Sequence, residues 1–318
     1  MKIKKVVVAG GGVLGSQIAF QSAYCGFEVV VWARSKSSAE HTQQKIDNLK
    51  KTYTDAINAM SKDKDAWCAG IADVDNFDKK SCLAKAEAAA SNLKIETDLS
   101  TALKGADLVI EAIAELKNEK IAFYKQIAPL LDSKTIVVTN SSTLLPSAFA
   151  KYTGRPEKYL ALHFANSIWK NNTAEVMAHA ETGDKYFDTL VDFAKDIRMF
   201  PLPIKKEKSG YLLNSMLVPF LLSGLDLYVN EISDPSSIDQ AWKRGTGAPN
   251  GPFEIIDVVG LQTAYNIVEQ YQKVPGLINP LLKKMMMPYN FKKMKEVLQK
   301  YISEGKLGKQ SGEGFYKY

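Results

Sequence analysis

One short stretch near the start limits what this chain can fold into more than any other feature. Residues 6–15 read VVVAGGGVLG, a valine-rich run that ends in three consecutive glycines before the helix-like part begins. Residues 3–9 predict a buried strand, residues 12–25 carry apolar side chains at helical spacing, and residues 28–32 predict a second strand. This order predicts a βαβ unit, in which two parallel strands are joined by a helix.

Three glycines of this stretch, Gly10, Gly12 and Gly15, occupy the positions of a GxGxxG pattern. The first permits a tight turn after the strand, the second lets a pyrophosphate approach the backbone, and the third allows close packing of helix and strand. The amino terminus of the following helix offers free N–H groups to the phosphates. We therefore expect a dinucleotide site that includes Gly10, Gly12, Val13, Leu14 and Gly15. The alternative is a glycine turn with a structural role only.

The acidic residue that usually holds the ribose of NAD is missing. In dinucleotide-binding proteins a carboxylate near the end of the second strand accepts the ribose 2′-hydroxyl bonds, whereas this chain has Ala33 there, followed by Arg34 and Ser35. A carboxylate would repel a 2′-phosphate, but alanine leaves room for one, and Arg34 and Ser35 can bind it through charge-assisted hydrogen bonds. These three residues are candidate cofactor-binding residues, and they favour NADP(H). The alternative is an NAD enzyme in which Arg34 only covers the adenine.

Strands and helices continue to alternate after the first βαβ unit. Residues 35–92 are rich in Lys, Asp, Ala and Gln and predict long helices, which we expect to form a protruding helical arm. Further strands are predicted at residues 106–113, 135–142 and 159–164, with helical segments between them. This alternation predicts an α/β fold, a Rossmann-type doubly wound parallel sheet.

The character of the sequence changes near residue 200. Residues 199–210, MFPLPIKKEKSG, contain two prolines and a charged cluster, and residues 211–232 then begin a long amphipathic helix. A chain of 318 residues is long enough for two domains. We expect a dinucleotide-binding domain at 1–203 and a mostly α-helical domain at 204–318 that contributes to the substrate cleft. The long apolar faces of the second domain predict a homodimer, although a packed core explains them nearly as well.

Charge, cysteines and apolar runs narrow the class of function. The formal charge of +6 comes from 41 basic and 35 acidic residues without a long basic run, which suits an anionic nucleotide or coenzyme A ester better than a nucleic acid. Cys25, Cys68 and Cys82 show no CxxC spacing, so neither disulfides nor a metal site are predicted. The apolar runs are too short to span a membrane. We expect a cytoplasmic protein that binds neither nucleic acid nor membrane.

Several further stretches resemble the L-3-hydroxyacyl-CoA dehydrogenase family. They are EAIAELKNEK (111–120), TNSSTL (139–144), LHFAN (162–166) with AEV (174–176), SGYLLNSMLVP (209–219), GTGAPNGPFEIIDVVGL (245–261) and the terminal GKLGKQSGEGFYKY. Their order and spacing agree with the family, so the resemblance covers nearly the whole chain. It implies an oxidoreductase that interconverts an L-3-hydroxyacyl-CoA, short-chain as in 3-hydroxybutyryl-CoA, and its 3-oxoacyl-CoA with NAD(P). NAD is the usual cofactor of that family.

The resemblance also implies a catalytic set. His163 would take the proton of the substrate 3-hydroxyl as general base and return it in the reverse direction, because imidazole exchanges protons near neutral pH. Glu175 would orient that imidazole, and Ser142 would hydrogen-bond the substrate oxygen. Asn214, in the first helix of the second domain, matches an amide that steadies the substrate. The family's cofactor-side positions correspond to Glu111, Lys120 and Asn140.

Each of these residues also has a purely structural explanation. A lone histidine such as His163 can be a hydrogen-bonded core residue, Ser142 can cap a turn, and Glu175 can lie on a solvated edge. Asn214, in a helix interior, can satisfy a buried backbone group. Residues 166–176, NSIWKNNTAEV, depart from the family's Asn-Pro-Val pattern, and we expect the bulky Trp169 near the acyl site, which leaves the acyl preference open.

The lysines of the arm leave coenzyme A recognition open. Relatives grip coenzyme A with the region that corresponds to residues 35–92, where no family motif is found. Lys45, Lys50 and Lys51 either contact its phosphates or form a solvated helix face. Two alternative functions are therefore kept. One is an NAD(P)-dependent dehydrogenase of a free 3-hydroxy or polyol acid, and the other is a catalytically idle dinucleotide-binding protein, which the presence of the catalytic set disfavours.

Overall fold

The valine-rich opening forms a central strand of an eight-stranded sheet in the computed structural model, which describes residues 2–272 and 289–318. The strand order is β3-β2-β1-β4-β5-β6-β7-β8, and every neighbouring pair is parallel except β6 with β7. The strands are β1 (Lys5–Ala9), β2 (Glu28–Trp32), β3 (Lys94–Glu96), β4 (Leu108–Glu111), β5 (Ile136–Thr139), β6 (Tyr159–Phe164), β7 (Thr173–Met177) and β8 (Phe200–Ile204). The predicted Rossmann-type fold is confirmed.

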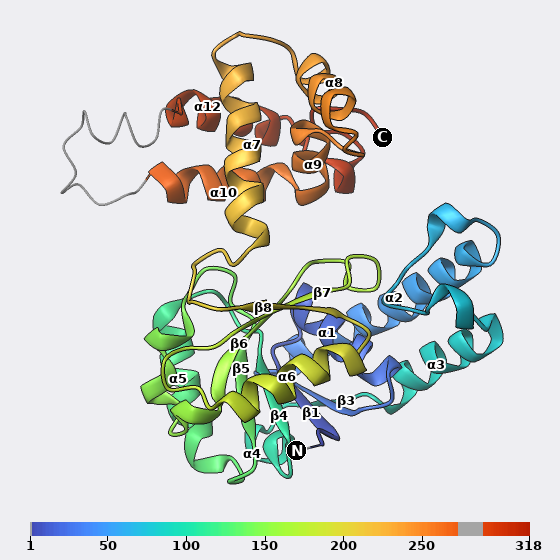
Figure 1. The fold of residues 1–318 in the computed structure, drawn as a ribbon, viewed down its shortest axis with the longest axis vertical. Helices are drawn as coiled ribbons and strands as arrows, with labels where there is room; N and C mark the ends of the chain where they lie inside the picture. Colours follow the sequence, from blue (N-terminus) through green and yellow to red (C-terminus); the bar gives the residue numbers. More distant parts are fainter. Residues whose placement is uncertain (1, 273–288) are drawn as a thin grey trace. The chain divides into compact units, whose positions relative to one another are not determined.

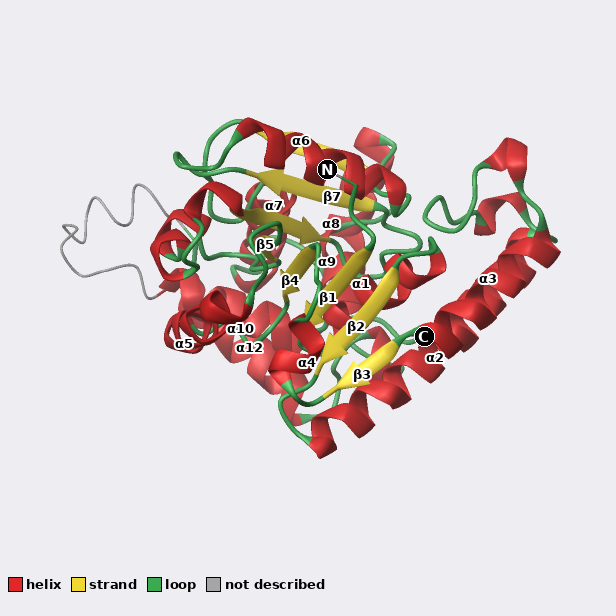
Figure 2. Cartoon of the chain, turned by 90° about the horizontal axis from the view of Figure 1, so that it is seen from below, coloured by secondary structure: helices red, strands yellow, loops and turns green. Residues whose placement is uncertain are grey.

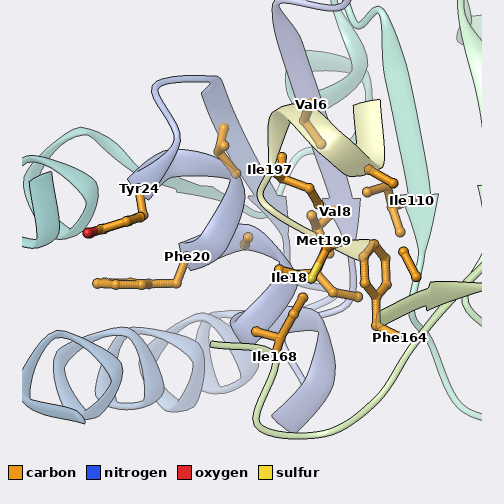
Figure 3. Close-up of a cluster of buried hydrophobic side chains, with 14 of the residues drawn as sticks. Val6, Val8, Ile18, Phe20, Tyr24, Ile110, Phe164, Ile168, Ile197 and Met199 are labelled. Atoms are coloured by element: carbon orange, nitrogen blue, oxygen red, sulfur yellow. The ribbon is translucent and has the colours of Figure 1, made fainter. Parts of the chain in front are cut away.

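Helices cover both faces of this sheet (Figure 2). They are α1 (Val13–Tyr24), α2 (Lys36–Met60), α3 (Lys79–Asn92), α4 (Leu99–Leu103), α5 (Lys117–Ile127) and α6 (Asp184–Asp196). Because side chains alternate along a strand, Val6 and Val8 pack with α1, α2, α3 and α6, whereas Val7 packs with α4 and α5 on the other face. Figure 3 shows the first of these two cores around Val6, Val8 and Ile18. Each buried valine contributes roughly 1.5–3 kcal/mol.

Three strands were not predicted from the sequence, namely β3, β7 and β8. β8 contains Pro201 and Pro203, which is possible because β8 lies at the edge of the sheet, where a missing N–H donor leaves no gap in the ladder. β7 runs antiparallel to β6 after a turn in which Ser167 has a left-handed backbone, with φ of 59°. The sheet therefore extends beyond the last predicted strand on the side that carries the candidate site.

Residues 35–92 contain the two long helices α2 and α3, which extend beyond the edge of the sheet (Figure 1). Lys50 of α2 and Glu87 of α3 form an ion pair of 2.6 Å. The loop between these helices is held to α1 and to the connection between β6 and β7, because the Gln21 amide of α1 donates to the Gly70 carbonyl and the Gly70 N–H donates to the Trp169 carbonyl. Trp169 packs against Tyr53 of α2, with 5.7 Å between the ring centroids.

The chain divides between Leu212 and Leu213 into two compact units. The described helices of the second unit are α7 (Leu213–Val229), α8 (Pro235–Thr246), α9 (Pro252–Val259), α10 (Leu261–Gln272) and α12 (Phe291–Ser303). They share one apolar core, and Asp257 accepts the N–H groups of Phe315 and Tyr316 from the terminal segment. Residues 273–288, also expected to be helical, lie outside the described residues. No helix in the described ranges is long and apolar enough to cross a membrane.

Candidate active site and coenzyme pocket

The glycine-rich turn after β1 borders a cavity of about 670 Å³. Gly10, Gly11 and Gly12 line it, and α1 begins directly after Gly12, so its free N–H groups lie at the cavity. Gly10 has φ of +114°, and a side chain there would come within 2.6 Å of the Ala112 carbonyl oxygen of the next strand. A side chain at Gly15 would overlap the Gly10 carbonyl oxygen. Only glycine fits these two positions, which is the arrangement that brings a pyrophosphate close to the backbone.

The residues after β2 form another wall of the cavity. Ala33 and Arg34, which were predicted to bind the cofactor, line this wall. Ser38, His41 and Lys45 of α2 line it beside them. Ser35 has a different place, because it caps α2 with its hydroxyl accepting the Ser38 N–H. Among the described lining residues between Trp32 and Lys45, Arg34 and Lys45 are positively charged, His41 is a third nitrogen base, and none is acidic. This wall can hold an anionic group.

Sequence reasoning did not name Ser38, His41 and Lys45 for the cofactor. The sequence does contain a pattern that indicates them. Their spacing of three and then four residues places them on one face of a helix that starts at the predicted ribose position. The lysines of this helix were instead considered for coenzyme A. The structure places Lys45 at the cavity and Lys50 in its ion pair with Glu87.

Four other predicted cofactor residues, Val13, Leu14, Glu111 and Lys120, are not among the described residues that line the cavity. Val13 is exposed and Leu14 half-buried in the first turn of α1. Glu111 and Lys120 are fully buried and form an ion pair of 2.6 Å. Glu111 also accepts hydrogen bonds from the Ile113 N–H, the Tyr124 hydroxyl and the Thr139 hydroxyl. A buried carboxylate with this many hydrogen-bond donors links β4, β5 and α5 rigidly to one another.

Glu115 lies between this buried pair and the turn that carries Ser142. One carboxylate oxygen accepts the Ser141 hydroxyl at 2.5 Å and both the N–H and the hydroxyl of Thr143, and the other lies 3.3 Å from Lys120. Partial burial acts to raise the pKa of Glu115, but the Ser141 bond, the Lys120 charge and the Thr143 bonds together hold that pKa below its usual value. Glu115 lies inside the stretch EAIAELKNEK, and its role could not be predicted from the sequence.

His163 lies between the side chains of Glu175 and Ser142. The imidazole Nδ1 is 2.8 Å from Glu175 Oε2, and Nε2 is 3.2 Å from Ser142 Oγ. His163 is on β6 and Glu175 faces it directly on the antiparallel strand β7, whereas Ser142 follows β5. Both His163 and Glu175 are buried, so their interaction is little screened by water. The structure therefore brings together three of the four predicted catalytic residues.

The neighbouring residues fix this arrangement further. Asn140 Oδ1 accepts the Phe164 N–H and so links the end of β5 to the end of β6 beside His163. The second oxygen of Glu175 accepts the Leu212 N–H at 2.8 Å, and the Tyr211 ring stacks on the His163 ring. Glu175 is thereby held at both carboxylate oxygens.

The Trp169 ring packs against the core beside Tyr53, and its carbonyl accepts the Gly70 N–H, so Trp169 anchors the arm. Its expected place near the acyl site stays a prediction. Asn214 lies in the first turn of α7, in the second unit, and is half-buried.

The arrangement has the parts that a proton transfer requires. With Nδ1–H donating to Glu175, the lone pair of Nε2 is available to a substrate hydroxyl near Ser142. The carboxylate then stabilises the imidazolium that forms when the proton is taken up. The coenzyme that would complete a redox reaction fits the glycine-lined cavity, because the space beside Gly12 is open to 4 Å and the helix that begins after it offers backbone N–H groups for a pyrophosphate.

The chain is similar to known proteins along nearly its whole length. Residues 5–207 match the model of the 3-hydroxyacyl-CoA dehydrogenase NAD binding domain, and residues 210–318 match that of the 3-hydroxyacyl-CoA dehydrogenase C-terminal domain. The mitochondrial hydroxyacyl-coenzyme A dehydrogenase of Homo sapiens is 32% identical over 99% of this chain and 91% of its own length. A 3-hydroxybutyryl-CoA dehydrogenase of Clostridioides difficile is 28% identical over 99% of both chains.

Solved structures extend the comparison. One solved structure is described as "Substrate-directed dual catalysis of dicarbonyl compounds by diketoreductase". It is 42% identical to this chain, its TM-score is 0.83, and the match covers 100% of both chains. Mycobacterium tuberculosis FadB2 is 25% identical, with a TM-score of 0.78 and complete coverage of both chains. Both domain models and the full-length relatives match along the same chain, in the order that the sequence predicts. The chain therefore belongs to the 3-hydroxyacyl-CoA dehydrogenase family of NAD(P)-dependent oxidoreductases.

Proposed function

We propose that the protein interconverts a 3-hydroxy group and a 3-oxo group, with His163 as the general acid and base. The observation that supports this most is the position of His163, hydrogen-bonded to Glu175 at Nδ1 and to Ser142 at Nε2. A structural histidine needs only one satisfied nitrogen and no orienting carboxylate. Here a carboxylate holds one nitrogen and a hydroxyl marks where a substrate oxygen would bind.

Each residue has a defined part in this proposal. In the oxidative direction His163 Nε2 takes the proton from the substrate hydroxyl, and Ser142 hydrogen-bonds the same oxygen as it becomes a carbonyl. Glu175 stabilises the imidazolium, and in the reductive direction the same proton returns to the carbonyl oxygen. The bound nicotinamide coenzyme supplies or accepts the hydride at the substrate carbon. Asn214 stays a proposed substrate-binding residue, and the homodimer and the cytoplasmic location stay predictions.

We propose that NADP(H) is the preferred coenzyme. Ala33 leaves space where a carboxylate would repel a 2′-phosphate, and Arg34 supplies a positive charge beside it. His41 and Lys45 of α2 line the same wall, one turn apart, so a 2′-phosphate would meet the charges of both Arg34 and Lys45, with the His41 imidazole beside them. An NAD enzyme has no need for this concentration of basic groups next to the ribose position.

The first candidate substrate is a short-chain L-3-hydroxyacyl-CoA with its 3-oxoacyl-CoA. Membership of the family supports it, as does the 3-hydroxybutyryl-CoA dehydrogenase that matches over 99% of both chains. The net charge of +6 favours the approach of an anionic coenzyme A ester.

A second candidate is a 1,3-dicarbonyl compound or the matching hydroxy acid without coenzyme A. The 42% identity with a diketoreductase favours it. The arm also offers less free positive charge than the sequence suggests, because Lys50 is paired with Glu87 and Lys45 lines the coenzyme cavity. The hydrogen-bonded set of His163, Glu175 and Ser142 disfavours a catalytically idle protein.

The two substrates are distinguished by initial rates of NADPH oxidation with acetoacetyl-CoA and with ethyl acetoacetate. Both carry the same 3-oxo group, and only the first carries coenzyme A. A kcat/KM for acetoacetyl-CoA at least 100-fold higher supports the acyl-CoA substrate. A preference for ethyl acetoacetate supports the second candidate. Absence of turnover with both, in a protein that binds NADPH, contradicts the proposed reaction.

A further inference from the structure

The segment that connects β8 to α7, residues 205–212, lies against the proposed catalytic residues. The Ser209 hydroxyl donates to the Thr143 carbonyl, next to Ser142, at 2.7 Å. The Leu212 N–H donates to Glu175. Between these two contacts the Tyr211 ring stacks on the His163 ring, with 4.6 Å between centroids and an angle of 20° between planes. The connecting segment thus contacts His163, Glu175 and the residue that follows Ser142.

Tyr211 has a backbone conformation that few side chains adopt. Its φ is 54°, in the left-handed region, which costs a residue other than glycine about 1–2 kcal/mol. The ring is 1% exposed and packs in a small cluster with Ala161 of β6, Met177 of β7 and Ile204 of β8. The left-handed turn is what directs this buried ring toward the sheet, so the favourable packing offsets the cost of the backbone.

The stacked Tyr211 ring restricts a rotation of the His163 imidazole that its two hydrogen bonds do not restrict. Bonds at Nδ1 and Nε2 define a line through the imidazole, and the ring can still tilt about that line. A flat aromatic face parallel to the imidazole prevents this tilt and keeps the Nε2 lone pair directed at the substrate oxygen.

We infer that Tyr211 is a positioning residue for the acid–base step, acting through His163 by its aromatic face. The inference rests on the proposed function, because it requires His163 to transfer the proton. Tyr211 lies in the segment that ends the first unit, so the backbone that sets its left-handed turn also sets the alignment of the proposed base. The hydroxyl of Tyr211 plays no part in this role.

Four variants test the inference, each measured for kcat, KM, NADPH affinity and the solvent deuterium isotope effect on kcat. Tyr211→Phe keeps the face, Tyr211→Leu removes it but fills the space, and Tyr211→Gly removes it and adopts the left-handed backbone without strain. Phe193→Leu is the matched control, because Phe193 is a buried aromatic of the same unit that packs on Phe27. The Phe193→Leu variant loses a buried aromatic ring that does not contact the proposed catalytic residues.

We expect Tyr211→Phe to retain kcat within about threefold. Tyr211→Leu and Tyr211→Gly should lower kcat by about 10- to 100-fold, the scale of a misaligned catalytic group, with NADPH affinity unchanged. Their solvent isotope effect should rise, because proton transfer becomes slower relative to other steps. Phe193→Leu should lose thermal stability but keep the normal kcat and isotope effect.

Wild-type kcat and isotope effect in folded Tyr211→Leu would overturn the inference. So would a loss of kcat matched by Phe193→Leu, since that would show a general effect of core damage. Measuring His163→Gln beside these variants distinguishes failure of the inference about Tyr211 from failure of the proposed function. If His163→Gln is inactive while Tyr211→Leu is normal, only the inference about Tyr211 is wrong. If His163→Gln turns over normally, the proposed function is wrong and the inference is wrong with it.

Discussion

His163 and Glu175 face each other across the antiparallel strands β6 and β7, with imidazole Nδ1 2.8 Å from carboxylate Oε2. Direct opposition in the strand register sets this pair, and the Leu212 N–H and the Tyr211 ring of the segment after β8 hold it further. A base oriented by strands keeps its position when substrate enters, because neighbouring strands move little relative to each other. The reversed direction of β7 is therefore the feature of the sheet that makes the site.

Removing the charge of Glu175 should impair catalysis more than folding. Glu175→Gln keeps the size of the side chain but no longer stabilises the imidazolium, and an amide can hold the wrong tautomer of His163. We expect kcat to fall by about 100-fold or more, with NADPH affinity unchanged, as measured by steady-state rates and calorimetry. Glu181→Gln, at an exposed position after β7, is the control. Equal activities of both variants would remove Glu175 from the proposed mechanism.

Coenzyme preference should respond to the wall after β2. Ala33→Asp with Arg34→Gln restores a ribose-binding carboxylate and removes a phosphate-binding charge, so the ratio of kcat/KM for NADPH to that for NADH should fall by at least about tenfold. Lys45→Gln alone should lower the ratio in the same direction. Lys51→Gln, on the exposed part of α2, should not change it. An unchanged ratio in the double variant would place the phosphate-binding residues elsewhere.

The buried pair of Glu111 and Lys120 should matter for stability. Lys120→Met leaves a fully buried carboxylate without its cation and should lower the free energy of unfolding by about 3–5 kcal/mol. Adding Glu111→Gln removes the uncompensated charge and should recover part of this loss. Lys50→Met, which breaks the exposed pair with Glu87, should cost no more than about 1 kcal/mol. Urea unfolding measures all three, and similar losses for Lys120→Met and Lys50→Met would contradict this account.

Glu115 should make a pH-dependent contribution to stability. Its pKa is lower in the folded protein than in the unfolded chain, so the folded state binds this proton more weakly. The stabilisation is therefore fully present above the unfolded pKa, about 4.3 for glutamate, and is lost as the pH falls through the lower folded pKa. We expect the difference in urea midpoint between wild type and Glu115→Gln to be constant from pH 7 to about pH 5 and to shrink below that. A difference that stays constant down to pH 3 would contradict the assigned contacts.

The parallel core of the sheet could be predicted because its signals are local. Val6 to Val8 form a continuous apolar run that predicts a strand. The glycines after them indicate a tight turn before a helix, so strand, turn and helix follow from adjacent residues. β8 could not be predicted, because Pro201 and Pro203 usually exclude a strand and are compatible with one only at a sheet edge. Edge position is a property of the whole sheet and is not encoded locally.

The candidate site divides in the same way. His163, Glu175 and Ser142 could be named from the family resemblance, and the structure brings them together. Tyr211 could not be named, since its position depends on a left-handed backbone that tyrosine does not signal. Glu111 shows the opposite case, because a carboxylate at a strand end suggests a ligand, whereas four hydrogen-bond donors and complete burial make it a rigid link between β4, β5 and α5.

The most direct test of the central claim compares His163→Gln with the wild-type protein in NADPH-dependent reduction of acetoacetyl-CoA and ethyl acetoacetate. The account predicts that whichever substrate the wild type reduces, the variant reduces it at least about 100-fold more slowly while binding NADPH with the same affinity. Loss of turnover with retained coenzyme binding would assign the proton transfer to His163. A variant that turns over at the wild-type rate would contradict the claim that His163 is the acid–base group.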